Sequence, residues 1–222
     1  LRAEGNLKWL DVGCGNGAFS GLITTSCFPS QVDAIDPSAE QIDFARSRSD
    51  AANVNFQVGD AMSLGLDDNA FDIAVMALVI FFVPDPPKGL SEMVRVVKRG
   101  GLVTSYTWDT INKGSPSSLI TGHLTEMGFK PDAPPNPQVS EMSALNKLWS
   151  SGGLVDLRSD VITVERRFKD IDEYWKIASL FPNIQKIVPV LTPDQISDLK
   201  IRIEQDLAMG DDWFLYQTAG AN

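Results

Sequence analysis

The sequence predicts a doubly wound α/β sheet of about seven strands, covered by helices and extended by a helical cap. Three observations support this fold class. Short apolar runs alternate with helix-length segments through the first half of the chain, as in parallel strand-helix-strand units. Each of the first three runs ends in a glycine-rich or acidic loop. The second half breaks the alternation with helical segments before strand character returns.

The first predicted strand, residues 7–12, runs into a loop with three glycines. Leu7, Trp9, Leu10 and Val12 suit a strand that is buried on both faces. The loop 13–17 (Gly-Cys-Gly-Asn-Gly) precedes a predicted helix of about residues 18–26, whose free N–H groups and positive dipole end lie at the same place. A ligand can therefore approach the backbone closely here.

The acidic residue before this loop changes what the loop is expected to bind. Asp11 would repel a phosphate but attract an ammonium group or bound water. The third glycine also comes one residue earlier than in the dinucleotide fingerprint. A tight strand-to-helix turn with no ligand is the alternative interpretation of an isolated loop of this kind.

The second and third predicted strands each deliver a carboxylate to the same edge of the sheet. Residues 31–36 end in Asp36, about 20 positions after the loop, where an acidic residue can accept hydrogen bonds from both hydroxyls of a ribose. Ser38 and Gln41 form a capping box for a helix of about residues 39–49. Residues 54–58 lead to Asp60. Turn formation is the alternative role of both aspartates.

The fourth and fifth strands complete the alternating half. Residues 71–79 are nearly all apolar and should form the most buried strand, and residues 80–83 should line a pocket or extend the core. Asp85 and the proline after it open a helix to about residue 98. Residues 102–108 form the next strand, which Asp109 follows.

The second half is predicted to divide into a cap and two further strands. Residues 1–109 form the α/β core, and residues 110–153 form a helical and loop segment of the cap. Residues 154–222 contain strands at 155–166 and 213–218, with a helical lid inserted at about 170–209. Thr192 and Gln195 make a second capping box before the long helix of this lid.

Composition and charge exclude several function classes. The formal net charge of −10 opposes binding to nucleic acid or to an anionic membrane surface. No apolar run approaches 20 residues, so we expect no membrane insertion. The two cysteines, Cys14 and Cys27, have no metal-ligand spacing, so we expect no metal site. The small number of cysteines indicates a cytoplasmic protein. The oligomeric state stays open.

The order of these features resembles the class I S-adenosylmethionine-dependent methyltransferases. Residues 9–17 are similar to the first motif of that family, Asp36 to the acid after its second strand, and residues 59–61 to the motif after its third. Residues 71–101 are similar to its fourth strand and the helix that follows, although Arg99 replaces a common proline. The resemblance covers about the first half of the chain. It implies a Rossmann-like, mostly parallel sheet with an antiparallel last strand and a cap over the acceptor.

The resemblance implies S-adenosylmethionine as the cofactor and assigns its binding residues. Asp11 and the glycine loop would hold the methionine part, Asp36 the ribose hydroxyls and Asp60 the adenine amino group. The implied cofactor-binding set is Asp11, Gly13, Cys14, Gly15, Gly17, Asp36, Pro37, Asp60, Ala61, Met62, Ala77 and Leu78.

Methyl transfer from a sulfonium is an in-line displacement, so alignment and water exclusion can supply most of the acceleration. An oxygen or carbon acceptor can also need a base, and the candidates are Asp109, Tyr106 and His123. Asp109 is favoured because it follows a parallel strand. The expected acceptor is a small molecule in an apolar pocket, whose walls we assign to Phe81, Phe82, Trp108 and Trp175.

Two other functions stay open from the sequence. One is a nicotinamide-dependent oxidoreductase, which the glycine spacing and Asp60 disfavour. The other is an S-adenosylmethionine-binding module without turnover. Asp85-Pro86-Pro87 resembles part of the signature of amino methyltransferases, but Lys88 replaces the aromatic residue and the tract comes too late after the fourth strand.

Overall fold

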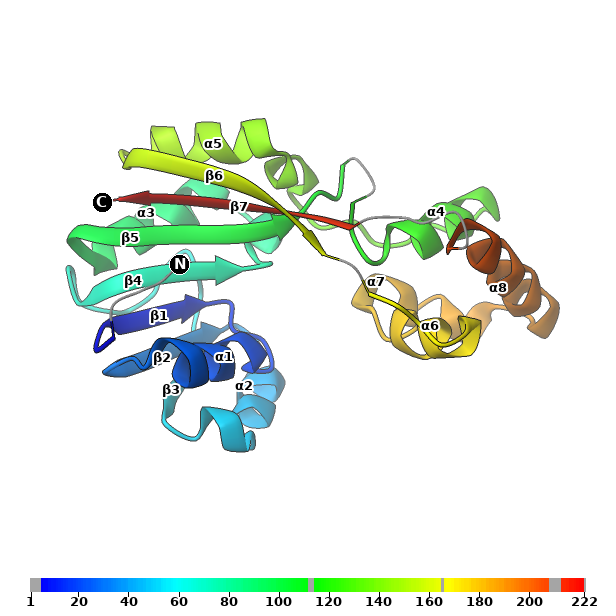
Figure 1. The fold of residues 1–222 in the computed structure, drawn as a ribbon, viewed down its shortest axis with the longest axis horizontal. Coiled ribbons are helices and arrows are strands. Elements are labelled where there is room, and N and C mark those ends of the chain that lie inside the picture. Colours follow the sequence, from blue (N-terminus) through cyan, green and yellow to red (C-terminus); the bar gives the residue numbers. More distant parts are fainter. Residues whose placement is uncertain (1–4, 112–113, 165, 208–212, 222) are drawn as a thin grey trace.

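Seven strands form a single sheet in the computed structural model, which describes residues 5–111, 114–164, 166–207 and 213–221 (Figure 1). The sheet order is β3-β2-β1-β4-β5-β7-β6. The strands are β1 (Lys8–Val12), β2 (Gln31–Asp36), β3 (Val54–Val58), β4 (Phe71–Ala77), β5 (Val97–Trp108), β6 (Val155–Val164) and β7 (Trp213–Ala221). The first five pair in parallel, and β7 is antiparallel to β5 and β6. This confirms the predicted mostly parallel sheet with an antiparallel last strand.

Helices cover both faces of the sheet because the strands are apolar on both sides. On β1, Trp9 packs with Ile23 of α1 (Ala18–Cys27), and the next residue, Leu10, packs in the opposite core. Helix α2 (Ala39–Arg46) packs against β2 and β3. The opposite core also contains residues of α3 (Pro86–Val96) and α5 (Met142–Ser151).

The predicted capping residues begin the helices as expected. The Ser38 hydroxyl accepts a hydrogen bond from the Gln41 N–H at 3.2 Å, at the start of α2. Asp85 accepts one from the Lys88 N–H at 3.1 Å, at the start of α3. Before α8 (Pro193–Leu207), the Gln195 N–H donates to the Thr192 hydroxyl and the Thr192 N–H donates to the Gln195 side chain, which is a complete capping box.

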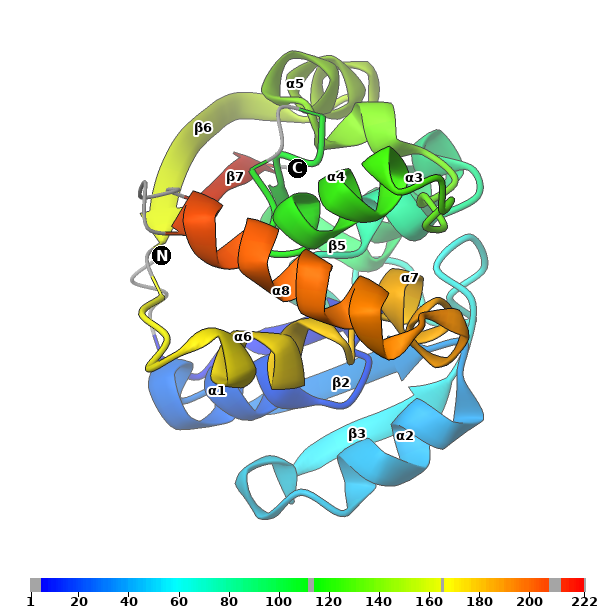
Figure 2. The same ribbon diagram turned by 90° about the vertical axis from the view of Figure 1, so that its right-hand side faces the viewer.

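Four helices form a cap beyond the carboxyl ends of the parallel strands (Figures 1 and 2). They are α4 (Ser118–Glu126), α6 (Ile171–Ala178), α7 (Pro182–Gln185) and α8. The cap has its own apolar core, which includes Leu124, Tyr174 and Leu199. His123 of α4 also forms a 2.7 Å contact with Asp206 of α8. The cap is thus a second packed unit, and it lies at the sheet edge that carries the loops after β1, β2 and β4.

The segment expected as one cap piece, residues 110–153, divides between the two units. Helix α4 packs in the cap, whereas α5 packs on the sheet. Trp149 of α5 is fully buried there, and its indole N–H donates to the carbonyl of Val103 at 3.2 Å. The apolar stripe of α5 therefore covers the sheet next to β6 and β7. Helices α6, α7 and α8 occupy the expected lid of about 170–209, of which residues 208 and 209 lie outside the described residues.

A buried carboxylate connects the loop after β3 to α3. Glu92 accepts hydrogen bonds from the Leu64 N–H at 3.0 Å and from the Arg95 guanidinium at 2.8 and 2.9 Å. Arg95 also donates to the Leu66 carbonyl at 2.7 Å. The Arg95 hydrogen bonds lower the pKa of Glu92 to about 2, although burial opposes the shift. The ionised carboxylate is therefore the form that holds this loop.

We predict that Glu92→Gln lowers the free energy of unfolding at pH 7 by about 1–3 kcal/mol, because the amide loses the charge-assisted bonds to Arg95. The folded pKa is depressed, so the contribution is present above the unfolded pKa near 4.5 and disappears as the pH falls toward 2. Urea unfolding of both proteins between pH 7 and pH 3 measures the difference. A difference that stays constant over this range would contradict the assignment.

Candidate active site

The glycine loop after β1 has a backbone that other residues would not easily adopt. Gly13, Gly15 and Gly17 all have positive φ, at 78°, 51° and 77°. A Cβ on Gly13 would lie 2.5 Å from a methyl carbon of Val79, so no larger residue fits there without movement. The N–H groups of Gly13 and Cys14 donate to the Ile35 carbonyl at 2.7 and 3.0 Å, which ties the loop to β2.

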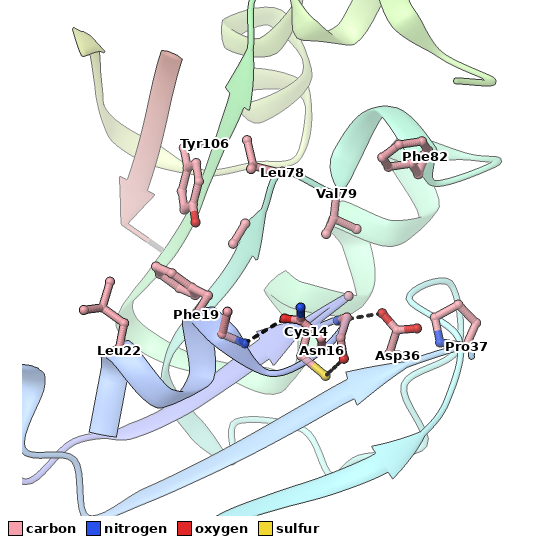
Figure 3. Close-up of a pocket in the computed structure, with 14 residues that line it drawn as sticks. Cys14, Asn16, Phe19, Leu22, Asp36, Pro37, Leu78, Val79, Phe82 and Tyr106 are labelled. Atoms are coloured by element: carbon pink, nitrogen blue, oxygen red, sulfur yellow. Dashed lines mark hydrogen bonds between the residues drawn. The ribbon is translucent and has the colours of Figure 1, made fainter. Parts of the chain in front are cut away.

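Asp36, at the end of β2, joins the glycine loop to the start of α2. One carboxylate oxygen accepts a hydrogen bond from the Gly15 N–H at 2.8 Å, and the other accepts one from the Ser38 N–H at 2.9 Å. Figure 3 shows the Asp36 side chain beside the loop, with the dashed bond to Gly15. The same carboxylate lines a cavity, so it both shapes the loop and presents negative charge to a ligand.

Asp11 is fully buried between β1 and α1 and does not line the cavity. One oxygen accepts a 2.6 Å hydrogen bond from the Ser20 hydroxyl. The other oxygen has no hydrogen-bond partner among the described residues. Burial raises the pKa of Asp11 to about 7, the Ser20 hydrogen bond opposes this, and the Asp36 charge adds to it. The ionised form of Asp11, which lies directly behind the glycine loop, therefore destabilises the folded protein.

The loop, the end of β2 and the ends of β4 and β5 enclose a cavity of about 640 Å³, which we call the loop cavity. Figure 3 shows Asp36 and Pro37 at one end and Phe19, Leu22 and Tyr106 at the other. The Phe19 and Tyr106 rings meet edge to face, with centroids 5.4 Å apart. The lining residues are Gly13, Cys14, Gly15, Asn16, Ala18, Phe19, Leu22, Asp36, Pro37, Ala77, Leu78, Val79, Phe82 and Tyr106.

The structure gathers most of the expected cofactor residues around the loop cavity. The exceptions are Asp11, Gly17 and the group that follows β3. Gly17 packs against Phe56. Asp60 accepts a hydrogen bond from the Met62 N–H at 2.8 Å, and Ala61 and Met62 pack against the core. This group still lies at the same sheet edge, because the N–H of the preceding Gly59 donates to the Asp36 carbonyl at 3.1 Å.

Several walls of the loop cavity were not among the predicted site residues. Phe19 and Leu22 lie three residues apart on α1, a spacing that places both on one helix face. This spacing, directly after a glycine loop, is a sequence pattern from which these two residues could have been predicted to line the cavity. Val79 and Asn16 also line the cavity, but their residue types carry no comparable signal.

A second cavity of about 400 Å³ lies between the sheet edge and the cap, and we call it the cap cavity. Leu78 lines both cavities, so the two share a wall at the end of β4. Leu78 has a positive φ of 63°, and its N–H donates to the Tyr106 carbonyl at 2.9 Å. The cap cavity is lined by Leu78, Trp108, Pro116, Val164, Arg166, Phe168, Tyr174, Ile177, Ala178 and Phe181.

The four residues expected as pocket walls separate in the structure. Trp108 lines the cap cavity and Phe82 lines the loop cavity. Phe81 is only 5% exposed and packs in the sheet core, whereas Phe82 is 57% exposed. Trp175 lies within the cap, 5.6 Å below the Lys200 ammonium, and lines neither cavity. Adjacent residues of a turn point in different directions, so an apolar tract does not reveal which side chain faces the cavity.

The three candidate bases also lie in different surroundings. Asp109 is buried, its carbonyl accepts a hydrogen bond from the Gly114 N–H at 2.7 Å, and it lines neither cavity. His123 contacts Asp206 and Glu126 within the cap. Tyr106 does line the loop cavity, but burial and the Asp11 charge raise the pKa of its phenol. Tyr106 therefore stays protonated and can donate a hydrogen bond.

Residues 5–111, 114–164, 166–207 and 213–221 contain no group of three or more His, Cys, Asp or Glu side chains arranged to hold a metal ion. Within the same ranges, no helix combines the length and apolar character needed to cross a membrane.

We predict that Asp11→Asn raises the free energy of unfolding of the ligand-free protein at pH 8 by on the order of 3 kcal/mol, because the amide keeps the Ser20 bond without a buried charge. The folded pKa is raised, so wild type loses stability as the pH rises from about 4 through 7. Urea unfolding at pH 5 and pH 8 should therefore show a larger gain at pH 8. A variant less stable than wild type at both pH values would contradict this.

Comparison with known proteins bears on this site. Residues 10–104 match the family model described as a methyltransferase domain. The chain is 33% identical over 119 residues to the malonyl-[acyl-carrier protein] O-methyltransferase of Serratia marcescens, covering 54% of this chain and 41% of that protein. It is 36% identical over 98 residues to the demethylmenaquinone methyltransferase of Staphylococcus aureus (strain JH9), covering 43% of this chain and 41% of that protein. The matches thus span about two fifths of the length of these relatives.

The fold extends the likeness beyond the matched residues. A phosphoethanolamine N-methyltransferase of Haemonchus contortus, solved in complex with S-adenosyl-L-methionine, has a TM-score of 0.61 at 18% identity, covering 99% of this chain and 49% of that chain. At this identity the likeness concerns the fold alone. The family match falls on the strands and loops that form the loop cavity, from β1 to β5. Residues 10–104 are therefore similar to a methyltransferase domain, and these matches together with the fold support a class I S-adenosylmethionine-dependent methyltransferase.

Proposed function

We propose that the chain binds S-adenosylmethionine in the loop cavity and transfers its methyl group to a small molecule held in the cap cavity. The observation that carries this proposal is the shared wall at Leu78, where the loop cavity adjoins the cap cavity. Two reactants in adjoining cavities can meet at that wall, and methyl transfer requires such a meeting of donor and acceptor.

The residues of the loop cavity fit the chemistry of this cofactor. Its volume of about 640 Å³ is in the range of small-molecule sites. The Asp36 carboxylate accepts two N–H bonds and retains further acceptor positions for ribose hydroxyls. The glycine loop leaves its backbone open to the methionine part. When bound, S-adenosylmethionine supplies the activated methyl group.

The charge distribution favours a cationic ligand over a phosphate. Asp36 faces the loop cavity and Asp11 lies behind the loop with an unpartnered oxygen. A bound ammonium or sulfonium group would favour the ionised form of Asp11 and offset part of its burial cost. A pyrophosphate would face the Asp36 carboxylate directly and would lie in front of Asp11, so its negative charge would be repelled. This supports S-adenosylmethionine over a nicotinamide dinucleotide.

The walls near the shared boundary can align the reactants and exclude water. Ala77, Leu78 and Val79 make this part of the loop cavity apolar. The protonated Tyr106 phenol can donate a hydrogen bond to a ligand and does not act as a base. Asp109 is not given a catalytic role, because it lines neither cavity. Alignment for in-line displacement is thus the main contribution of the described residues.

Three observations support a small molecule as the acceptor. The cap cavity, at about 400 Å³, has the size of a small organic ligand and mostly apolar walls. The net charge of −10 disfavours nucleic acid. The names of two relatives, a malonyl-[acyl-carrier protein] O-methyltransferase and a demethylmenaquinone methyltransferase, also support this choice.

We predict that Asp36→Ala weakens S-adenosylmethionine binding at least about tenfold, because the variant loses the ribose acceptor and releases the Gly15 N–H. Calorimetric titration measures the affinity. Asp43→Ala is the matched control, since Asp43 lies on the neighbouring α2, is exposed and pairs with the exposed Arg46. Absence of saturable binding by folded wild type, or equal affinities of the two variants, would overturn the cofactor site.

We predict that Ile177→Trp lowers methyl transfer at least about tenfold while S-adenosylmethionine affinity stays within about twofold, because the indole fills the cap cavity and leaves the loop cavity intact. Formation of S-adenosylhomocysteine with a panel of phenol, amine and quinone-like acceptors gives the rate. Ile201→Trp, at an exposed position of α8, is the control. No turnover by wild type with any acceptor would favour a binding module without catalysis.

A further inference from the structure

Among the described residues that line the cap cavity, Arg166 is the one that carries a charge. Arg166 follows β6 and lines this cavity together with Trp108, Phe168 and Phe181. The Arg166 guanidinium carbon lies 5.3 Å from the centre of the Phe168 ring. A guanidinium stacked on an aromatic ring loses little rotamer freedom when it binds, and its planar donors match a carboxylate.

No carboxylate of the described residues pairs with Arg166. The acidic residues that follow Arg166 in the sequence, at the start of α6, have other partners. Asp170 caps α6 by accepting a hydrogen bond from the Glu173 N–H at 2.9 Å, and Asp172 pairs with Lys200 at 2.7 Å. The Glu173 carboxylate accepts a hydrogen bond from the Lys169 N–H at 2.7 Å. In a chain with a net charge of −10, an arginine at the wall of an apolar cavity that pairs with none of the described carboxylates is a candidate to bind an anion.

We propose that the acceptor of this methyltransferase is an apolar or aromatic acid, whose carboxylate pairs with Arg166 while its body fills the cap cavity. The inference rests on the proposed function. The apolar body would lie among Trp108, Phe168 and Phe181, and the methyl-accepting atom would lie at the Leu78 wall, where the cavity meets the loop cavity. Arg166 thus selects and orients the acceptor without taking part in the displacement.

The negative charge of the acceptor would determine its orientation, because carboxylates on the cofactor side would repel it. Asp36 and Asp11 lie on the cofactor side of the Leu78 wall and would repel an anion there. An acid therefore has one favourable orientation in the cap cavity, with its carboxylate at Arg166 and away from these two carboxylates. A neutral molecule of the same shape has no such preference.

The test compares two probes of matched shape, 2-naphthoate and the neutral 2-naphthamide. Each is titrated by calorimetry into protein saturated with S-adenosylhomocysteine, so the loop cavity is filled. We expect 2-naphthoate to bind at least about tenfold more tightly, as a charge-assisted bidentate pair allows. Because Arg166 is exposed, raising the salt from 0.05 to 0.5 M should reduce this preference.

Substitution then assigns the preference to one side chain. Arg166→Gln should weaken 2-naphthoate to the affinity of 2-naphthamide and leave 2-naphthamide within about twofold. Arg167→Gln is the matched control, because Arg167 is the adjacent arginine and lines neither cavity. It should keep the preference. Unfolding midpoints equal to wild type show that both variants fold.

Several results would overturn the inference: equal affinity of the two probes for wild type, no binding of 2-naphthoate, an unchanged preference in Arg166→Gln, or an equal loss in Arg167→Gln. S-adenosylhomocysteine alone is therefore first titrated into the protein, and this measurement separates a failure of the acid acceptor from a failure of the proposed function. If S-adenosylhomocysteine binds and the naphthyl probes show no preference, the cofactor site stands and only the acid acceptor is excluded. If it does not bind, the cofactor site itself fails.

Discussion

The site depends on the hydrogen bonds that the Asp36 carboxylate accepts. Its two oxygens hold the Gly15 and Ser38 N–H groups, so one side chain fixes the glycine loop and the start of α2 at the end of β2. These bonds need a parallel arrangement of β1 and β2, because only then do the two strand ends meet at one edge. The parallel pairing of the strands therefore brings Asp36 to the loop. The same side chain then fixes the shape of the loop and supplies the charge in the cavity.

The molecule is built from two packed units, the sheet with its helices and the cap, and its chemistry is assigned to their boundary. The sheet and its helices provide rigid strand ends, and the cap helices pack around a core of their own beyond those ends (Figure 1). Leu78 lies at this boundary and contributes to both cavities. A site between two separately packed units can be closed to water while its donor and acceptor enter from different sides.

Asp11 shows that a residue of a ligand site can destabilise the folded protein. Its buried carboxyl has a pKa of about 7 and one oxygen without a partner in the described part of the chain. An ordinary core position would carry an apolar residue. A carboxylate that destabilises the ligand-free protein is consistent with a role in binding a cation, because the ligand then recovers part of the cost.

Much of the fold was predictable from the sequence because local physical rules determine it. Alternating apolar runs located all seven strands, and capping residues such as Ser38, Asp85 and Thr192 located helix starts. The meeting of the glycine loop with Asp36 also followed from strand order alone. These features depend on residue type, spacing and the rule that parallel strands end at one edge.

Only the tertiary structure decided which side chains face empty space. Phe81 and Phe82 are identical in type, yet one lies in the core and the other lines the loop cavity. Trp175 lies inside the cap, Asp109 lies away from both cavities, and Arg166, an apparent surface charge, lines the cap cavity. Hydrophobic patterning reports that a residue avoids water, but it cannot report whether its neighbour is another side chain or a cavity. That distinction arises from long-range packing between the sheet and the cap, which no local pattern encodes.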